Sequence, residues 1–264
     1  VSGIVERRHT LPILANLLFK KNGNSVSLVS TDIEIQITTH ADFGVGSDTL
    51  NTTVGARKLV DILRALPEGA LSLSLKDNKM VVQSGKSRFT LQTLAANEFP
   101  IMAESSDVLS SWEISQKNLK QLIGQVHFAM AQQDIRYYLN GLLLVIDQDS
   151  LKAVATDGHR LAYCAVKASD TGVQIQLNGD RQEVIIPRKA VIELQRLLND
   201  SDAPVNIEFA SNQARFSFDQ IENPVKRLIA LIEMLSKFAN LTVDDWQDLY
   251  QQEQNEQDNS SMFC

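Results

Sequence analysis

The feature that most constrains this chain is a repeat of its own sequence pattern. The segment SVSLVSTDIEIQITTHA parallels SLKAVATDGHRLAYCAV, and TVGARKLVDILRALPEGALSLSL parallels VIIPRKAVIELQRLLNDSDAPVNIEF. The offset is 125 residues between Thr31 and Thr156, and 131 residues between Arg57 and Arg188. A repeat of that period is as long as a domain, so the sequence predicts two copies of one fold.

Each copy combines strands with helices, which predicts the α+β class. Residues 56–66 carry apolar side chains at helical spacing until Pro67 ends the pattern, and residues 188–198 repeat it after Pro187. Apolar or alternating stretches predict strands over 13–19, 25–39, 142–146, 151–156 and 160–166.

A polar, irregular stretch over residues 106–112 is interpreted as a linker between the copies. A further helix is expected over 115–131, with Ser115 as its N-cap. The first copy has no counterpart of that helix. We therefore expect the first domain to be incomplete at its start and to continue a longer protein.

Composition limits the classes of protein that fit. The formal net charge of −7 argues against a typical nucleic-acid-binding domain, which would be basic. Both repeated helices nevertheless begin with Arg-Lys, which would give equivalent faces of the two copies a positive charge. The sequence has no membrane-length apolar run, no signal peptide and no CxxC pair, so we expect a cytoplasmic protein.

Two stretches concentrate the side chains suited to chemistry or binding. The stretch 128–141, FAMAQQDIRYYLNG, offers Gln, Arg and Tyr for phosphate, sugar and base contacts; the alternative is a polar loop anchored by its tyrosines. The stretch 155–161, ATDGHRL, is interpreted first as a structural turn and second as a binding loop. No activated nucleophile, metal-ligand spacing or phosphate-binding glycine motif is present, so neither an enzyme nor a cofactor is expected.

Taken together, these stretches resemble the bacterial sliding clamp, the beta subunit of DNA polymerase III. The resemblance rests on RRHTLPILANLL, STDIEI, ARKLVDILRALPEG, SGKSRFTLQTLAANEFP, FAMAQQDIRYYLNG, VATDGHRLA and VIIPRKAVIELQRLL, in order over residues 1–221. It implies duplicated clamp domains, with helices on one inner face and antiparallel sheets outside. Domain I would span 1–105 and domain II 111–222.

The resemblance also implies a function. Family members are non-catalytic processivity factors that form a head-to-tail ring of three-domain subunits around double-stranded DNA. Their partners are DNA polymerase III subunits, the clamp loader and other proteins with a clamp-binding peptide. The resemblance implies DNA contacts for Arg8, Arg57, Gln133, Tyr137 and Tyr138, with further candidates at Arg64, Gln132, Arg136, Arg188 and Lys189. It implies one half of a peptide pocket from Leu139, Thr156, Gly158, His159, Arg160 and Leu161.

The end of the chain departs from the family. Residues 223–264 do not match it, and their apolar periodicity and acidic composition predict a helical tail of unknown origin. The third domain of the family is not found. The alternative function is therefore a truncated or frameshifted clamp fragment that binds partner peptides or intact subunits without closing a ring.

Overall fold

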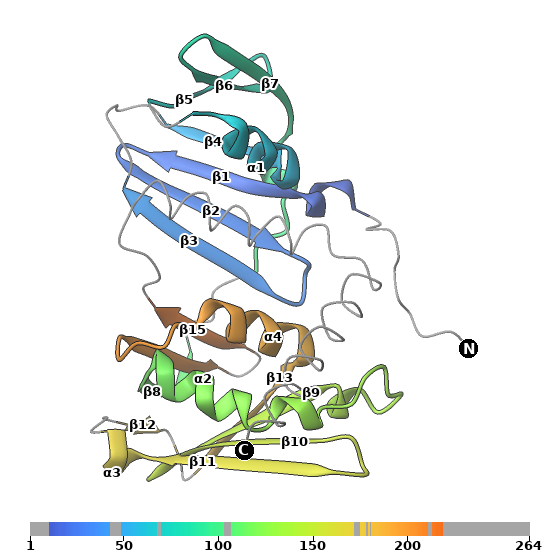
Figure 1. Cartoon of the computed structure of the whole chain (residues 1–264), viewed down its shortest axis with the longest axis vertical. Helices are drawn as coiled ribbons and strands as arrows, with labels where there is room; N and C mark the ends of the chain where they lie inside the picture. The colour runs from blue at the N-terminus through green and yellow to red at the C-terminus, as the bar shows by residue number, and fades with distance from the viewer. Residues whose placement is uncertain are drawn as a thin grey trace. The chain divides into compact units, whose positions relative to one another are not determined.

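A computed structural model describes residues 11–42, 49–67, 70–102, 107–171, 175–177, 179, 181–210 and 213–218. The chain divides into two compact units (Figure 1). The described residues up to Met102 belong to the first unit, and those from Asp107 to Phe218 belong to the second. The predicted tail, 223–264, lies outside the described residues. None of the described helices is long and apolar enough to cross a membrane.

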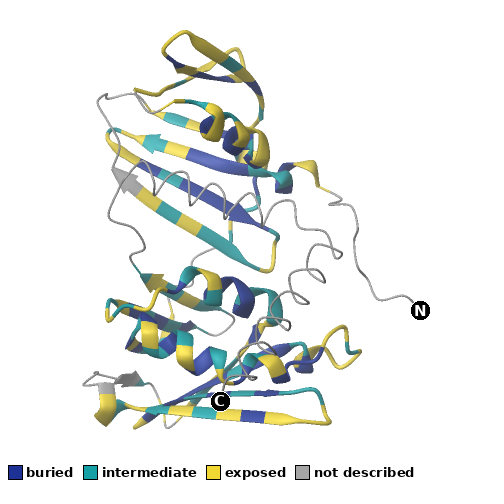
Figure 2. Cartoon of the chain, viewed as in Figure 1, coloured by how far each residue is buried: buried dark blue, intermediate teal, exposed yellow. Residues whose placement is uncertain are grey.

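The first unit is built on an antiparallel sheet with the strand order β3-β2-β1-β4-β7-β6-β5. Its strands are β1 (Asn16–Asn22), β2 (Ser25–Thr31), β3 (Gln36–Asp42), β4 (Leu50–Gly55), β5 (Ser72–Lys76), β6 (Lys79–Ser84) and β7 (Ser87–Leu94). Helix α1 (Ala56–Ala65) packs against β4 and β7. The apolar side of α1 meets the sheet in a core where Leu17, Leu59 and Met80 are fully buried (Figure 2).

The second unit has two antiparallel sheets, in the strand orders β11-β10-β9-β13 and β12-β8-β14-β15. Their strands are β8 (Val108–Ser115), β9 (Gly141–Asp147), β10 (Ser150–Thr156), β11 (Leu161–Lys167), β12 (Ile175–Leu177), β13 (Arg181–Pro187), β14 (Pro204–Ala210) and β15 (Ala214–Phe218). Helix α2 (Gln116–Gly124) packs against strands of both sheets, and α4 (Arg188–Leu197) packs against β9 and β13. The sequence-based prediction of an α+β chain is thus confirmed for the described residues.

Short elements complete the two units. They are the 3-10 turns η1 (Pro12–Ala15), η2 (Ala96–Glu98), η3 (His127–Ala129) and η4 (Tyr137–Leu139), and the one-turn helix α3 (Ala168–Thr171). The strand predicted over 13–19 therefore starts late, because Pro12 opens a 3-10 turn before β1.

Other boundaries predicted from sequence also differ. The linker predicted over 106–112 is wrong, because most of it belongs to β8, where Trp112 is fully buried and pairs with Ile175 and Ile207. The predicted N-cap of α2 is confirmed: the Asn118 backbone N–H donates to the Ser115 hydroxyl at 3.2 Å. The helix ends at Gly124, earlier than predicted.

The strand predicted over 25–39 is a hairpin, because side chains at its centre bend the backbone. The Thr31 hydroxyl donates to the Ile35 carbonyl at 2.8 Å. The Asp32 carboxylate accepts from the backbone N–H groups of Glu34 and Ile35 at 3.1 and 2.8 Å. These bonds satisfy the turn internally but leave Ile33 at φ +82°, where a β-branched residue is strained.

The second unit repeats the same turn between β10 and β11. The Thr156 hydroxyl donates to the Arg160 carbonyl at 2.7 Å. The Asp157 carboxylate accepts from the backbone N–H groups of His159 and Arg160, both at 2.9 Å. The left-handed position is here occupied by Gly158, at φ +90°, which tolerates it. The repeat seen in the sequence thus extends to individual hydrogen bonds.

The two copies differ where β5 and β14 correspond. Among the described residues, β5 is the edge of its sheet, with Leu75 41% exposed, whereas β14 is an inner strand paired with β8 and β15. The inward residues of β14, Ile207 and Phe209, are buried. Within the described residues, the same hairpin position is therefore an edge in one unit and an inner strand in the other.

The turn between β9 and β10 is fixed by the carboxylate of Asp147. It accepts from the Ser150 hydroxyl and backbone N–H at 2.7 and 2.8 Å and forms an ion pair with Lys152. Partial burial raises the pKa of Asp147, but the hydrogen bonds from Lys152 and Ser150 outweigh it and lower the pKa to about 2.

Replacing the strained residue of the first turn should stabilise the protein. Ile33→Gly removes a left-handed penalty of about 1–2 kcal/mol and adds a backbone entropy cost of about 0.5–1 kcal/mol. We expect the free energy of unfolding to rise by about 0.5–1 kcal/mol, measured by urea denaturation. Ile35→Gly, in the same turn but without a positive φ, should lower it; equal effects of the two substitutions would contradict the strain.

Removing the Asp147 carboxylate should destabilise the protein in a pH-dependent way. The lowered pKa means that this carboxylate stabilises the fold fully above its ordinary pKa, and that the contribution is lost as the pH falls towards 2. Asp147→Asn should lower the free energy of unfolding by about 1 kcal/mol at pH 7, and this difference should shrink as the pH falls from about 4 through 2. Asp149→Asn, in the same turn, is the control. A difference as large at pH 2 as at pH 7 would show that the charge is not responsible.

Candidate functional site

The predicted DNA-contacting residues of the first unit lie on α1. Arg57 follows the first residue of the helix and Arg64 lies in its last turn, and both are exposed. Arg8 lies outside the described residues. The first unit thus presents two exposed guanidinium groups from one helix, as the Arg-Lys pattern predicts.

In the second unit, Arg188 and Lys189 begin α4. The Arg188 backbone N–H donates to the Asn140 carbonyl at 3.0 Å, and its guanidinium donates to the Met130 carbonyl at 3.3 Å. The bond to Met130 holds one end of the segment between η3 and β9, and the bond to Asn140 holds the other. Arg188 therefore positions that segment, a structural role that the sequence did not indicate.

The segment held in this way, residues 131–140, is named the 131–140 loop. The Ala131 N–H donates to the Leu139 carbonyl at 3.0 Å, which closes the base of the loop. Its tip is exposed, at 98% for Ile135, 83% for Tyr137 and 50% for Tyr138. The two tyrosine rings meet edge to face with centroids 5.9 Å apart. Gln132 and Gln133 are also exposed on this loop.

Two residues outside the predicted set give the loop its shape. Asn140 accepts from the Asp134 N–H at 2.9 Å and donates its amide to the Asp134 carbonyl at 2.8 Å. The Asp134 carboxylate in turn accepts from Arg136, whose side-chain and backbone hydrogen bonds lower the pKa of Asp134 to about 2. Gln133 is held at φ +52° between these contacts. The Asp and the Asn of the QDIRYYLN motif are the sequence features from which this role could have been predicted.

The predicted peptide-pocket residues lie beside this loop. Leu139 is buried at its base, whereas Leu161, which follows the turn 156–160, is 67% exposed. Arg160 holds the turn to the start of the loop segment: it pairs with Asp157 at 3.0 Å, donates to the Phe128 carbonyl at 2.7 Å and lies over the Phe128 ring. Hydrogen bonds from the backbone of Arg160 and His159 lower the pKa of Asp157, so its carboxylate stays ionised.

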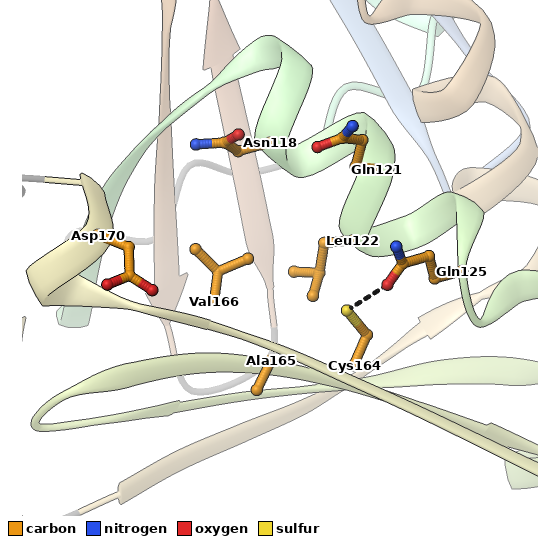
Figure 3. Close-up of a pocket in the computed structure, with 8 residues that line it drawn as sticks. All are labelled: Asn118, Gln121, Leu122, Gln125, Cys164, Ala165, Val166 and Asp170. Carbon is orange, nitrogen blue, oxygen red and sulfur yellow. Dashed lines mark hydrogen bonds between the residues drawn. The ribbon is translucent and has the colours of Figure 1, made fainter.

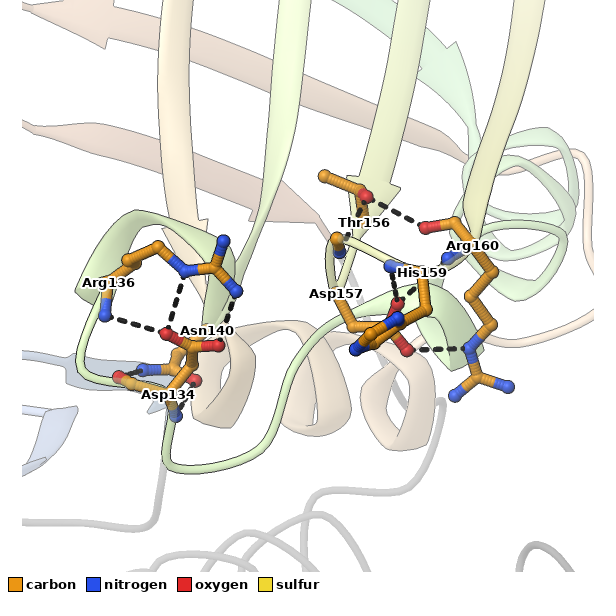
Figure 4. Close-up of polar contacts among 8 residues, drawn as sticks. Asp134, Arg136, Asn140, Thr156, Asp157, His159 and Arg160 are labelled. Atoms are coloured by element: carbon orange, nitrogen blue, oxygen red, sulfur yellow. Dashed lines mark hydrogen bonds and ion pairs between the residues drawn. The ribbon is translucent and has the colours of Figure 1, made fainter.

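The loop and the turn come close to one another at Gly158, and Figure 4 shows the polar contacts within each of them. A Cβ atom on Gly158 would lie 3.3 Å from Arg136 Nη2, so the missing side chain leaves room for the guanidinium. The residues predicted for DNA and those predicted for peptides are therefore parts of one continuous surface in the second unit.

A cavity of about 330 Å³ lies elsewhere in the second unit, between α2 and β11 (Figure 3). Asn118, Gln121 and Gln125 line it from the helix and Cys164 from the strand, with the Cys164 thiol donating to Gln125 Oε1 at 2.8 Å. None of the predicted site residues lines this cavity, and no motif in the sequence indicated it.

Comparison with known proteins gives a consistent result. The sequence-family model of the DNA polymerase III beta subunit N-terminal domain matches residues 1–103. The family model of the central domain of that subunit matches residues 113–230. The beta sliding clamp of Pseudomonas aeruginosa is 44% identical over 216 residues, which are 81% of this chain and 57% of that protein. The beta sliding clamp of Escherichia coli K12 is 42% identical over 217 residues, with the same two shares.

Solved structures agree. A DNA polymerase sliding clamp from Pseudomonas aeruginosa with ligand superposes with a TM-score of 0.74 at 41% identity, over 83% of this chain and 58% of that one. A Pseudomonas aeruginosa sliding clamp bound to griselimycin gives 0.73 at 40% identity, over 86% and 63%. The fold and the family predicted from the motifs are thereby confirmed.

The chain spans about 57% of the length of the curated relatives that it matches. Within that span, the two consecutive family models, the relatives and the solved structures all identify the same family. The chain belongs to the DNA polymerase III beta-subunit family, the sliding clamps.

Proposed function

We propose that the protein is a sliding-clamp processivity factor of the replicative DNA polymerase. It contributes to a ring of subunits around duplex DNA and tethers polymerase, clamp loader and other partners through their peptides. It works in the cytoplasm as a non-catalytic accessory subunit. The observation that carries the proposal is the continuous surface in the second unit, where an aromatic loop adjoins a turn that the exposed Leu161 follows. Membership of the sliding-clamp family supports it.

The DNA side of the proposal rests on the 131–140 loop and on α1. Tyrosine hydroxyls and glutamine amides hydrogen-bond to phosphate and sugar without reading sequence, which suits a protein that moves along DNA. The exposed Arg57 and Arg64 add a cationic contribution that weakens with salt. Arg8, Gln132, Gln133 and Lys189 are proposed as further DNA contacts.

The peptide side rests on the turn 156–160 and the leucines that flank it. Internal hydrogen bonds hold the turn rigid, so little conformational entropy is lost when a peptide docks. Leu161 offers exposed apolar surface, and His159 and Arg160 supply a polar rim. Thr156, Gly158 and Leu139 complete the proposed half-pocket. That a related clamp is bound to griselimycin supports a ligand site in this family.

Loss of the exposed leucine should weaken peptide binding. Leu161→Asp places a charge on the apolar contact and should lower affinity at least about tenfold for a fluorescent peptide carrying Gln-Leu-x-Leu-Phe, measured by anisotropy. Val108→Asp, at another exposed apolar position of the second unit, should leave affinity unchanged. Equal affinity of the Leu161 variant and the wild type would contradict the assignment of the pocket.

Loss of both tyrosines should weaken DNA binding. Replacing Tyr137 and Tyr138 by Ala removes two hydrogen-bonding groups and should lower the affinity for a labelled duplex about fivefold at low salt. Tyr163→Ala, at an exposed tyrosine of β11, is the matched control. If the double variant binds as the wild type does, the loop is not a DNA contact.

A further inference from the structure

The 131–140 loop carries one cation, and a carboxylate of the same loop holds it. Arg136 donates to Asp134 from its backbone N–H at 2.8 Å, from Nε at 3.0 Å and from Nη2 at 2.8 Å. The two side-chain bonds run to different oxygens of the carboxylate, which is the bidentate geometry of a strong pair. The Arg136 side chain is 49% exposed, so its guanidinium is accessible to DNA.

The same guanidinium is also confined by the turn. Gly158 leaves just enough room for it, since a Cβ there would approach Arg136 Nη2 to 3.3 Å. Arg136 therefore lies between Asp134 and Gly158, held by contacts within the second unit; Figure 4 shows its bonds to Asp134. Nε and one N–H of Nη2 are held by Asp134, so a phosphate that binds this edge of the guanidinium has to displace the carboxylate.

The rest of the loop has no charge. Residues 131–140, AQQDIRYYLN, contain one acid and one base, so the loop is neutral while this pair holds. Its exposed groups are the amides of Gln132 and Gln133, the apolar Ile135 and the two tyrosines. Each phosphate neutralised by a cation adds counterion release and affinity, and a neutral loop lacks that contribution.

From this geometry we infer that Asp134 is a positioning residue that keeps Arg136 away from DNA phosphates, so that the loop touches duplex DNA only through uncharged groups. The inference rests on the proposed DNA contact of the loop. It adds that Asp134 limits the affinity of that contact. A bound arginine would hold the loop at one phosphate, whereas uncharged hydrogen-bonding groups exchange partners along the backbone at lower cost.

The ionisation of the pair supports this role. The hydrogen bonds that Arg136 donates lower the pKa of Asp134 to about 2, and the same contact raises the pKa of Arg136. Both groups therefore remain charged, and the pair persists, across the whole physiological pH range.

Salt dependence of duplex binding tests the inference on the full chain. Asp134→Asn keeps an oxygen that can accept from Arg136 but removes the charge that retains the guanidinium. We expect affinity for a labelled duplex to rise by up to about tenfold at 50 mM salt, and the slope of log affinity against log salt to steepen by about 0.9. Combining Asp134→Asn with Arg136→Gln should return the slope to that of the wild type.

Two further variants separate this role from others. Glu208→Gln removes a carboxylate from Arg215 on the other sheet and changes net charge equally, so it should leave the slope unaltered. Arg136→Gln alone should also leave the slope unaltered, because the wild-type arginine neutralises no phosphate. A shallower slope for Arg136→Gln would show that Arg136 already binds phosphate and would overturn the inference.

The remaining outcomes are equally decisive. If Asp134 only maintains the loop, Asp134→Asn loosens it and lowers affinity without steepening the slope, which overturns the inference. The same steepening in Glu208→Gln would do so too, by assigning the effect to net charge. If the wild type binds duplex and loss of the tyrosines weakens binding, the proposed function stands whatever Asp134 does. If the wild type does not bind at low salt, both proposals fail.

Discussion

The candidate surface of the second unit depends on the hydrogen bonds that the Asp157 carboxylate accepts. The Asp157 carboxylate fixes the backbone of the turn, and its ion pair with Arg160 fixes the direction of that side chain. Arg160 then reaches the Phe128 carbonyl, at the start of the segment that becomes the 131–140 loop. One side chain therefore sets where the turn lies relative to the loop. A turn held only by backbone hydrogen bonds would have no side chain directed at the loop, so it would not fix the position of the turn relative to the loop.

The sequence predicts most of the fold because the repeated pattern and the prolines mark its elements. Pro67 and Pro187 delimit the two equivalent helices, and apolar runs mark β9 and β10. The bend at Thr31–Ile35 escaped prediction because alternation continues through it, and side-chain hydrogen bonds of Thr31 and Asp32 add to one backbone bond, from the Asp32 N–H to the Ile35 carbonyl, to make the turn. The first part of β8 was assigned to a linker because serines 110 and 111 hide an alternating pattern in which Ser110, Trp112 and Ile114 are buried.

The candidate site was predictable only in part. The motifs identify the exposed glutamines and tyrosines and the exposed Leu161, but they do not show that the loop and the turn touch. That contact joins Arg136 to Gly158, two residues far enough apart in the sequence that no local pattern connects them. Asp134 was also missed, because its role follows from the geometry of one ion pair rather than from a residue type at a spacing.

Among the described residues, β5 is the unpaired edge of its sheet, and a strand edge of that kind affects how a protein behaves in concentrated solution. An unpaired strand with exposed leucine can pair with the same strand of another molecule, and sheets joined at their edges aggregate. Lys76 and Lys79 lie on either side of the hairpin turn, at one end of this edge. Charge repulsion between molecules at that end opposes such pairing. Among the described strands of the first unit, β5 is therefore the place where two copies could pair, and the two lysines are the charges that oppose it.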